Sequence, residues 1–201
     1  MDVYIKLNEL ARLYAIATYT FAENDASDNE QYGLNIDLFV KRPPAFPRLR
    51  GAGALAEHRH QPVQLRMGYR YSRSPDTPTV SVQNRLLAEL TLRATPHAFS
   101  LSDRNGIDAR WTDGEYSARY RNRIYLEVPA KLKGYGFTPY GNAEWFYSIT
   151  DNEWTSVRYE VGAQLPVVSH FTVELYGGWQ TYWHSTSPTV RGPGVNLVFS
   201  W

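Results

Sequence analysis

The sequence predicts an all-β fold, a single transmembrane, antiparallel up-and-down β-barrel of about ten strands. First, apolar and polar residues alternate along most of the 201 residues, as in strands with two unlike faces. Second, several of these runs reach the roughly ten residues that a tilted strand needs to cross a bilayer. Third, the final run, residues 195–201, alternates strictly and ends on the aromatic Trp201. We expect residues 1–201 to form one domain.

Ten runs carry the alternation, and each has one apolar and one polar face. In chain order they cover residues 13–21, 32–40, 63–71, 86–94, 107–111, 116–128, 137–147, 157–165, 171–183 and 195–201. The fifth run is the weakest, and the sixth is interrupted by Asn122. Turn-forming residues separate the runs, so each run predicts one strand.

The connections between the runs differ in length. The turns at residues 95–97 and 166–170 are short, whereas the longer loops 22–31, 72–81 and 185–192 are polar. If Trp201 ends on the periplasmic side, the short turns lie there and these long loops face outside, as in other membrane barrels. The connection at residues 42–62 is the exception, because it is long and yet expected in the periplasm. We interpret it as a mobile loop or as a docking segment for a periplasmic or envelope protein.

Composition narrows the class of protein further. The chain has no Cys, which excludes disulfides, a thiol nucleophile and thiolate metal sites. A net charge of +1 predicts no nucleic-acid partner. No apolar stretch is long enough for a transmembrane helix, and the N-terminus lacks the apolar core of a signal peptide. Either the protein is never exported, or this is a mature form with an added Met. The strand pattern favours the second, in the outer membrane of a Gram-negative bacterium.

Aromatic residues gather near the ends of the predicted strands. The chain has 15 Tyr and 6 Trp, whose rings combine an apolar body with a polar edge and suit a membrane–water interface. We expect the lipid bilayer to be a partner of the protein. The predicted interface aromatics are Tyr69, Tyr71, Trp111, Trp145, Tyr147, Trp179, Trp183 and Trp201.

The polar faces of the strands are rich in Arg and Glu. Side chains two apart on a strand point to the same side, so these charges are expected to share the lumen. The predicted lumen residues are Arg66, Arg70, Arg85, Glu89, Arg93, Arg119, Arg121, Arg123, Glu127, Glu144, Arg158, Glu160 and Glu174. A barrel of about ten strands is narrow, and unpaired desolvated ions are costly, so the first interpretation is a structural Arg–Glu network that fills the lumen. The alternative is a narrow anion-preferring channel lined by Arg.

Four segments resemble a known family. They are Leu-Ser-Asp-Arg-Asn at 101–105, Arg-Tyr-Arg-Asn-Arg at 119–123, Phe-Thr-Pro-Tyr at 137–140 and the terminal strand. Together they resemble a proteobacterial outer-membrane β-barrel family known only as a domain of unknown function, over roughly residues 60–201. The resemblance implies a barrel and an outer-membrane location but no activity. The terminal strand also looks like the signal read by the barrel-assembly machinery, although most such signals end in Phe.

Catalysis and metal binding have weaker support in the sequence. His184 is the only His expected near the outer rim, where Asp113 or Asp151 would be its acidic partner in a surface enzyme. His58 and His60 with Glu57 lack further ligands at a convincing spacing, so we expect neither a metal site nor a cofactor.

We therefore expect a non-enzymatic outer-membrane barrel that acts as an envelope scaffold or as a component of a larger assembly. The alternatives are the anion-preferring channel, the surface enzyme with His184, and a soluble ligand-binding barrel of the lipocalin type. A soluble barrel would turn its apolar faces inward, which is the arrangement that separates it from the other three.

Overall fold

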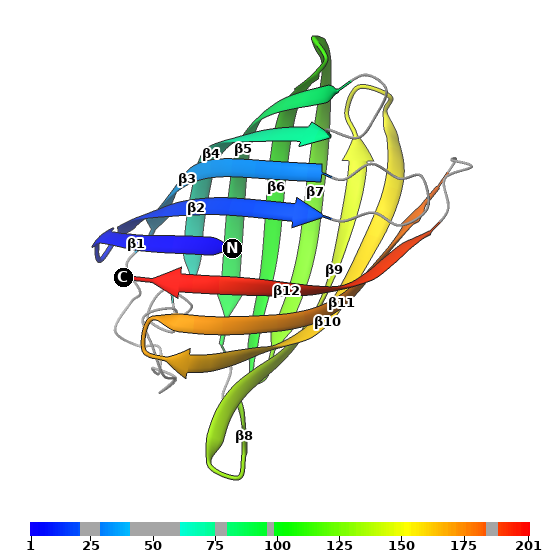
Figure 1. The fold of residues 1–201 in the computed structure, drawn as a ribbon. Coiled ribbons are helices and arrows are strands. Elements are labelled where there is room, and N and C mark those ends of the chain that lie inside the picture. Colours follow the sequence, from blue (N-terminus) through cyan, green and yellow to red (C-terminus); the bar gives the residue numbers. More distant parts are fainter. Residues whose placement is uncertain (21–28, 41–60, 75–79, 96–98, 184–188) are drawn as a thin grey trace.

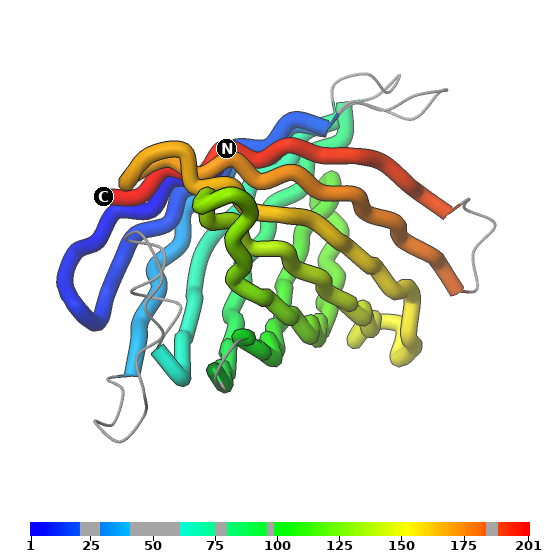
Figure 2. The backbone as a smooth tube through the Cα atoms, turned by 90° about the horizontal axis from the view of Figure 1, so that it is seen from below, coloured from blue at the N-terminus to red at the C-terminus, as the bar shows by residue number. Residues whose placement is uncertain are grey.

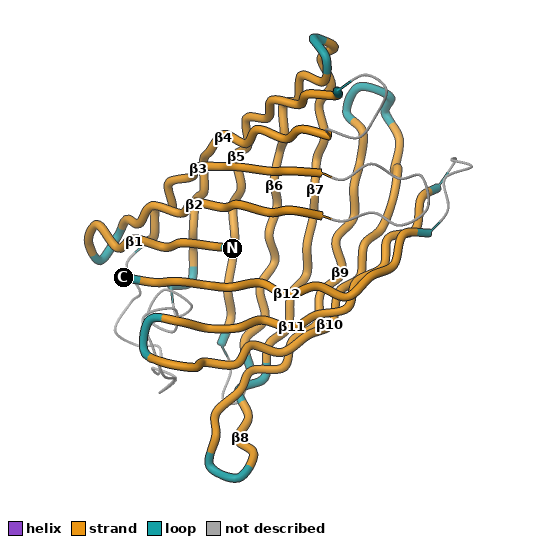
Figure 3. Tube along the Cα trace, viewed as in Figure 1, coloured by secondary structure: helices purple, strands orange, loops and turns teal. Residues whose placement is uncertain are grey.

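The computed structural model describes residues 1–20, 29–40, 61–74, 80–95, 99–183 and 189–201. Those residues form strands and turns only, which confirms the predicted all-β barrel (Figure 3). None of them forms a helix long and apolar enough to cross a membrane. The strands are β1 (Asp2–Asn8), β2 (Ala11–Thr20), β3 (Asn29–Phe39), β4 (Val63–Ser74), β5 (Ser81–Ala94), β6 (Ser100–Thr112), β7 (Glu115–Glu127), β8 (Ala130–Leu132), β9 (Tyr135–Ser148), β10 (Glu153–Val168), β11 (Phe171–Tyr182) and β12 (Val190–Ser200).

Eleven strands close into the barrel, and each pairs with its neighbours in the chain. The sheet closes because β9 pairs with β10 as well as with β7, while β12 pairs with β1. The short β8 pairs only with β9, as a hairpin that projects beyond the barrel (Figure 1). All pairs of neighbours are antiparallel except β1 and β12. An odd number of strands in an up-and-down barrel leaves one such parallel pair.

The strand beyond the ten expected ones is β1. It has seven residues, and its register sets Asp2 opposite Val198 and Tyr4 opposite Ser200. The backbone amide of Trp201 donates to the Tyr4 carbonyl, and the Lys6 amide donates to the Trp201 carbonyl. The two ends of the chain therefore lie side by side, as the blue and red strands show (Figures 1 and 2). We call the end of the barrel that carries Trp201 the C-terminal end, and the other the opposite end.

The two faces of the barrel wall differ in polarity, and the polar face is the inner one. The apolar positions of the runs point outward: Leu34 is 58 % exposed, Ile107 54 % and Val195 65 %. The side chains between them are buried in the lumen, where Asp37 and Asp108 are both 0 % exposed. This is the inverse of a soluble ligand-binding barrel, in which apolar side chains form the core.

Two tight hairpins use backbone conformations with positive φ. Asp113 and Gly114 join β6 to β7 with φ of 52° and 92°, and Lys133 and Gly134 join β8 to β9 with 51° and 89°. Paired positive φ values are those of the type I′ turn, whose twist matches that of antiparallel strands. The Val82 amide and the Ser81 hydroxyl donate to the Asp113 carboxylate and hold its pKa below the usual range. This turn is thereby tied to β5.

Candidate functional site: the charged lumen

A continuous belt of ion pairs crosses the lumen wall, and it begins at Asp37 on β3. Asp37 accepts hydrogen bonds from Arg12 Nε on β2 at 2.8 Å, and from Arg66 Nε and Nη2 on β4 at 2.6 and 2.9 Å. Three charge-assisted hydrogen bonds to one carboxylate offset much of the cost of removing it from water. The three strands are thus joined on the inner side of the wall.

Glu89 on β5 is the next carboxylate of the belt. Its Oε1 lies 2.6 Å from Arg121 Nη2, and its Oε2 lies 3.6 Å from Arg104 Nη1 and 4.0 Å from Arg66 Nη1. Arg66 faces Glu89 directly across the β4–β5 ladder, whereas Arg121 reaches it from β7, past β6. Gly106 stands between Glu89 and Arg121 in the register. Since Gly has no side chain, it leaves room for this contact across a strand.

Asp108 and Glu144 complete the belt. Asp108 on β6 lies 2.9 Å from Arg119, 3.1 Å from Arg121 and 3.9 Å from Arg85. Glu144 on β9 lies 2.6 Å from Arg123 and 3.3 Å from Arg121. Arg121 therefore contacts three carboxylates and is the centre of the network.

The belt has more positive than negative groups. Its four carboxylates, on Asp37, Glu89, Asp108 and Glu144, are shared by seven guanidinium groups. The seven belong to Arg12, Arg66, Arg85, Arg104, Arg119, Arg121 and Arg123. Three positive charges are thus left unbalanced within the belt, and they raise the electrostatic potential of the space that it faces.

Aromatic rings support several of these guanidinium groups. Arg12 lies over the Tyr4 ring at 4.3 Å, and Arg66 lies over the Tyr14 ring at 4.2 Å. The Arg119 guanidinium lies 4.8 Å from the ring of Phe146, a buried lumen residue. Cation–π contacts of this kind stabilise a desolvated positive charge without a counter-ion.

The wall formed by β10, β11, β12 and β1 carries carboxylates of a different kind. Glu160 accepts hydrogen bonds from the Tyr140 hydroxyl at 3.2 Å and the Asn142 amide at 3.1 Å. The Asn196 amide bridges Asp2 at 2.8 Å and Glu174 at 3.2 Å. Within the described ranges, none of these three acids has a salt bridge to Arg or Lys.

Two cavities lie between these walls. The smaller, of about 220 Å³, lies toward the C-terminal end and is lined by residues such as Arg93 and Thr172. The larger, of about 720 Å³, lies toward the opposite end and is lined by residues such as Arg70 and Thr20. Seven residues line both cavities, so the cavities meet at mid-height of the barrel: Asp2, Arg66, Glu89, Arg104, Arg123, Tyr125 and Glu174.

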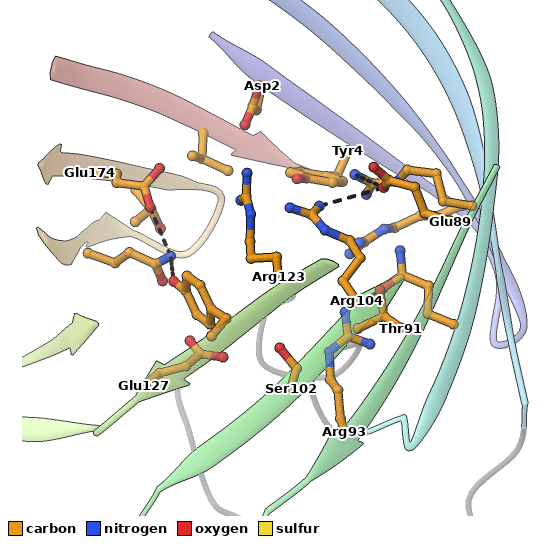
Figure 4. A pocket seen from close by; sticks show the side chains of 17 residues that line it. Asp2, Tyr4, Glu89, Thr91, Arg93, Ser102, Arg104, Arg123, Glu127 and Glu174 are labelled. Atoms are coloured by element: carbon orange, nitrogen blue, oxygen red, sulfur yellow. Dashed lines mark hydrogen bonds and ion pairs between the residues drawn. The ribbon is translucent and has the colours of Figure 1, made fainter. Parts of the chain in front are cut away.

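The junction of the cavities brings the two walls face to face. Figure 4 shows Arg123 and Arg104 extending from the β6–β7 wall, with Asp2 and Glu174 across the space from them. Glu174 is held there by the Gln164 amide, which also contacts the Tyr125 hydroxyl. The lumen therefore contains the predicted Arg–Glu network, and the two cavities remain beside that network.

Most of the predicted lumen charges enter the belt. Seven of them do so: Arg66, Arg85, Glu89, Arg119, Arg121, Arg123 and Glu144. Arg93 donates to Gln64, Arg158 donates to Gln180, and Glu127 lines the smaller cavity. Arg70, Glu160 and Glu174 line the larger cavity.

Four belt residues are missing from the predicted set: Arg12, Asp37, Arg104 and Asp108. Three of them lie beside an outward-facing apolar residue, as Asp37 does between Ile36 and Leu38. Arg104 instead lies between the polar residues Asp103 and Asn105. The alternation that identified Glu89 also applies to Arg12, Asp37 and Asp108, but it gives no signal at Arg104.

The predicted interface aromatics all belong to the outward face of the wall or continue its alternation. Tyr69 is 45 % exposed and Trp179 is 39 % exposed, the latter stacked on Tyr159 at 5.3 Å between ring centroids. By their places along the strands, Trp201 is at the C-terminal end. The others lie toward the opposite end: Tyr69, Tyr71, Trp111, Trp145, Tyr147, Trp179 and Trp183.

One polar cluster interrupts the apolar outer face, on β6 and β7. The Asn122 amide donates to Asp103 at 2.6 Å and to Asn105 at 3.1 Å, and the Tyr120 hydroxyl donates to Asn105. These residues satisfy one another's hydrogen bonds, which reduces the cost of placing them on an otherwise apolar surface. The interruption of the sixth run at Asn122 has this cluster as its cause.

The residues proposed for catalysis or metal binding are mostly beyond what the structure describes. His58, His60 and His184 fall outside the described ranges, so the pairing of His184 with an acid stays a prediction. Asp151 accepts a hydrogen bond from the Ser148 hydroxyl at 2.6 Å. Among the described residues, no three His, Cys, Asp or Glu are grouped so as to hold a metal ion.

Comparison with known proteins identifies one family. A family model described as "Protein of unknown function (DUF2490)" matches residues 54–191, which is more than half of the chain. No curated protein matches the chain, and no solved structure does. The matched residues extend from the connection before β4 to the start of β12, and so include most of the ion-pair belt.

Proposed function

The chain belongs to DUF2490, a family of proteins of unknown function, and from this premise we propose that it is a non-enzymatic outer-membrane β-barrel. In this role it acts as an envelope scaffold or as a component of a larger assembly. The proposal is supported above all by the polarity of the wall, which is apolar outside and ionic inside.

The outer face fits a lipid environment. Large apolar side chains are exposed on strand after strand, among them Leu86 at 51 %, Val161 at 54 % and Leu175 at 45 %. In water, this apolar outer surface would cost about 25 cal/mol for each Å² left uncovered. Ten of the eleven barrel strands have 10 to 16 residues, and a tilted strand crosses a bilayer with about 9–11.

The inner face supports a structural role. The belt joins seven neighbouring strands, from Arg12 on β2 to Glu144 on β9, through contacts in which each acid meets at least two Arg. A network in which every acid is shared resists the movement of any one strand. Rigidity of this kind suits a scaffold. The proposed partners of the protein are the barrel-assembly machinery and an envelope protein, the latter binding at residues 42–62.

A second candidate function, a narrow anion-preferring channel, is favoured by a different observation. Two cavities meet at mid-height, and the belt beside them carries more guanidinium than carboxylate groups. Arg surplus at a constriction attracts anions and repels cations. In this candidate the belt both holds the wall and sets the selectivity.

The membrane proposal is tested by purifying the protein in detergent and comparing its migration in gels with and without boiling. A folded membrane barrel migrates differently when it is not boiled, and it floats with liposomes after reconstitution. A protein that stays monomeric and folded in buffer without detergent would rule out the proposal.

The two candidates are separated by recording currents across planar bilayers that contain the reconstituted protein. The scaffold predicts no discrete conductance steps at either voltage polarity. The channel predicts steps whose reversal potential in a chloride gradient indicates anion preference, and Arg123→Gln weakens that preference.

A further inference from the structure

Charges of opposite sign are segregated across the larger cavity. On the β4–β7 side, Arg70 has no hydrogen bond or ion pair within the described ranges, and its buried Nε has no partner. On the β10–β1 side, Glu160, Glu174 and Asp2 accept hydrogen bonds from neutral groups. All four line the same cavity.

The different pairing of the acids on the two walls explains why, within the described ranges, Arg70 on one side and the carboxylates on the other lack salt bridges. The β4–β7 wall has carboxylates, Glu89 and Asp108, but these are already shared among five Arg of the belt. In the described part of the chain, the acids of the β10–β1 wall form no salt bridge to Arg. Arg158 of β10 instead donates twice to Gln180, at 2.9 and 2.7 Å. Among the described residues, one side of the cavity therefore holds a guanidinium group without a salt bridge, and the other holds three carboxylates without a salt bridge to Arg or Lys.

A ligand that carries both charges would satisfy both sides at once. The cavity of about 720 Å³ is within the range of small-molecule sites, about 300–1,000 Å³. An anion alone would neutralise Arg70 and leave the three acids, and a cation alone would leave Arg70 unmatched. We propose that this cavity binds a small zwitterionic solute of the amino-acid or short-peptide class, with its carboxylate at Arg70 and its ammonium group at Glu160, Glu174 and Asp2.

Polar groups around the cavity suit such a ligand. Figure 4 shows the junction with the smaller cavity, where Arg123 extends between Glu174 on one side and Arg104 on the other. Tyr176 and Tyr125 also line the larger cavity, and their rings supply flat surfaces beside the charged groups.

This inference goes beyond the proposed function and holds whether the barrel is a scaffold or a channel. It is tested by isothermal titration calorimetry of the whole protein in detergent at neutral pH. The probes are glycine, diglycine and triglycine, each compared with its N-acetyl form, which lacks the ammonium charge, and its amide, which lacks the carboxylate. We expect at least one zwitterion to bind at least tenfold more tightly than both of its singly charged forms, since one charge-assisted contact is lost in each.

Substitutions assign the two ends of the ligand. Arg70→Gln should weaken binding of the zwitterion about tenfold and leave the amide unaffected, whereas Glu174→Gln should weaken the zwitterion and leave the N-acetyl form unaffected. Arg110→Gln is the matched control, because Arg110 is also on the inner side of β6 but lines neither cavity. Arg70→Lys, which keeps the charge, should restore most of the affinity if Arg70→Gln folds poorly.

Two outcomes would overturn the inference, and both differ from failure of the proposed function. If the N-acetyl form binds as tightly as the zwitterion, the cavity is an anion site, as the channel candidate requires. If none of the probes releases heat of binding at millimolar concentration, the cavity holds solvent alone. The gel and liposome tests of the barrel are unaffected by either result.

Discussion

Asp37 offers the most direct test of whether the ion-pair belt holds the barrel together. It is fully buried and accepts three hydrogen bonds, one from Arg12 and two from Arg66. Asp37→Asn keeps the shape but removes the charge, and its new amide hydrogens point toward groups that are themselves donors. Each charge-assisted hydrogen bond contributes about 1.5–3 kcal/mol, and the retained oxygen still accepts one of the three bonds at the place of Oδ1 or two at the place of Oδ2. We therefore expect a loss of about 3–5 kcal/mol in the free energy of unfolding.

The assay is equilibrium unfolding in urea, followed by Trp fluorescence, with the barrel reconstituted in lipid or detergent. Glu115→Gln is the matched control, because Glu115 is an exposed acid at the start of β7, and its substitution should change stability by less than about 0.5 kcal/mol. A loss of less than about 1 kcal/mol for Asp37→Asn would refute the reasoning.

A double-mutant cycle isolates the pair of Asp37 with Arg12. Asp37 is the only carboxylate within 4.0 Å of Arg12 in the described chain, so Arg12→Met removes the unpaired charge that Asp37→Asn leaves behind. The double variant should therefore be more stable than the sum of the single losses implies, by about 1 kcal/mol or more. Strictly additive losses would mean that the two groups do not interact across the β2–β3 ladder.

Two further predictions concern backbone and turn. Ser81→Ala removes one donor to Asp113 and should raise the pKa of that carboxyl toward its usual value of about 4, measured by NMR titration. An unchanged pKa in Ser81→Ala would contradict this prediction. Because the pKa of Asp113 is lowered in the folded state, its contribution to stability is present above the unfolded pKa and is lost as pH falls through the folded pKa. Gly68→Ala would place a Cβ 2.7 Å from the Leu34 carbonyl oxygen and should destabilise the barrel by about 1–3 kcal/mol. Gly136→Ala is the control, because its Cβ would lie in open space and should leave the stability unchanged. Equal unfolding midpoints for the two variants would count against this prediction.

The fold could be predicted from the sequence because a period of two is visible without knowing any contact. Leu34, Ile36 and Leu38 alternate with Asn35 and Asp37, and this alone sets which side of the wall each residue takes. The strand β1 was not predicted, although Val3, Ile5 and Leu7 alternate with Tyr4 and Lys6 as in the other strands. What decides its place is its hydrogen bonding with the strand at the other end of the chain, which no local pattern shows.

The composition of the site could be predicted, but its pairing could not. Alternation assigns Arg66, Glu89 and Arg121 to the lumen, yet only the register sets Arg66 opposite Glu89. Arg121 reaches Glu89 past β6 because Gly106 leaves the space free, a relation between three strands. Similarly, charge counts along the chain did not reveal that the acids of the β2–β9 wall are paired with Arg, whereas Glu160, Glu174 and Asp2 are held by neutral groups.

That difference in pairing assigns different roles to the two walls. From β2 to β9 the acids are held by guanidinium groups, as Asp108 is by Arg119 and Arg121, so their charges are used within the protein. On the β10–β1 side, neutral donors such as Asn196 position Glu174 and Asp2, which form no salt bridge to Arg or Lys within the described ranges. If these acids served only to close the barrel, ion pairs would be expected, because an ion pair neutralises a buried carboxylate and a neutral hydrogen bond does not. These carboxylates are held in place without a salt bridge, and they lie across a cavity from Arg70, whose Nε has no partner among the described residues. This is the arrangement expected of side chains that bind a ligand.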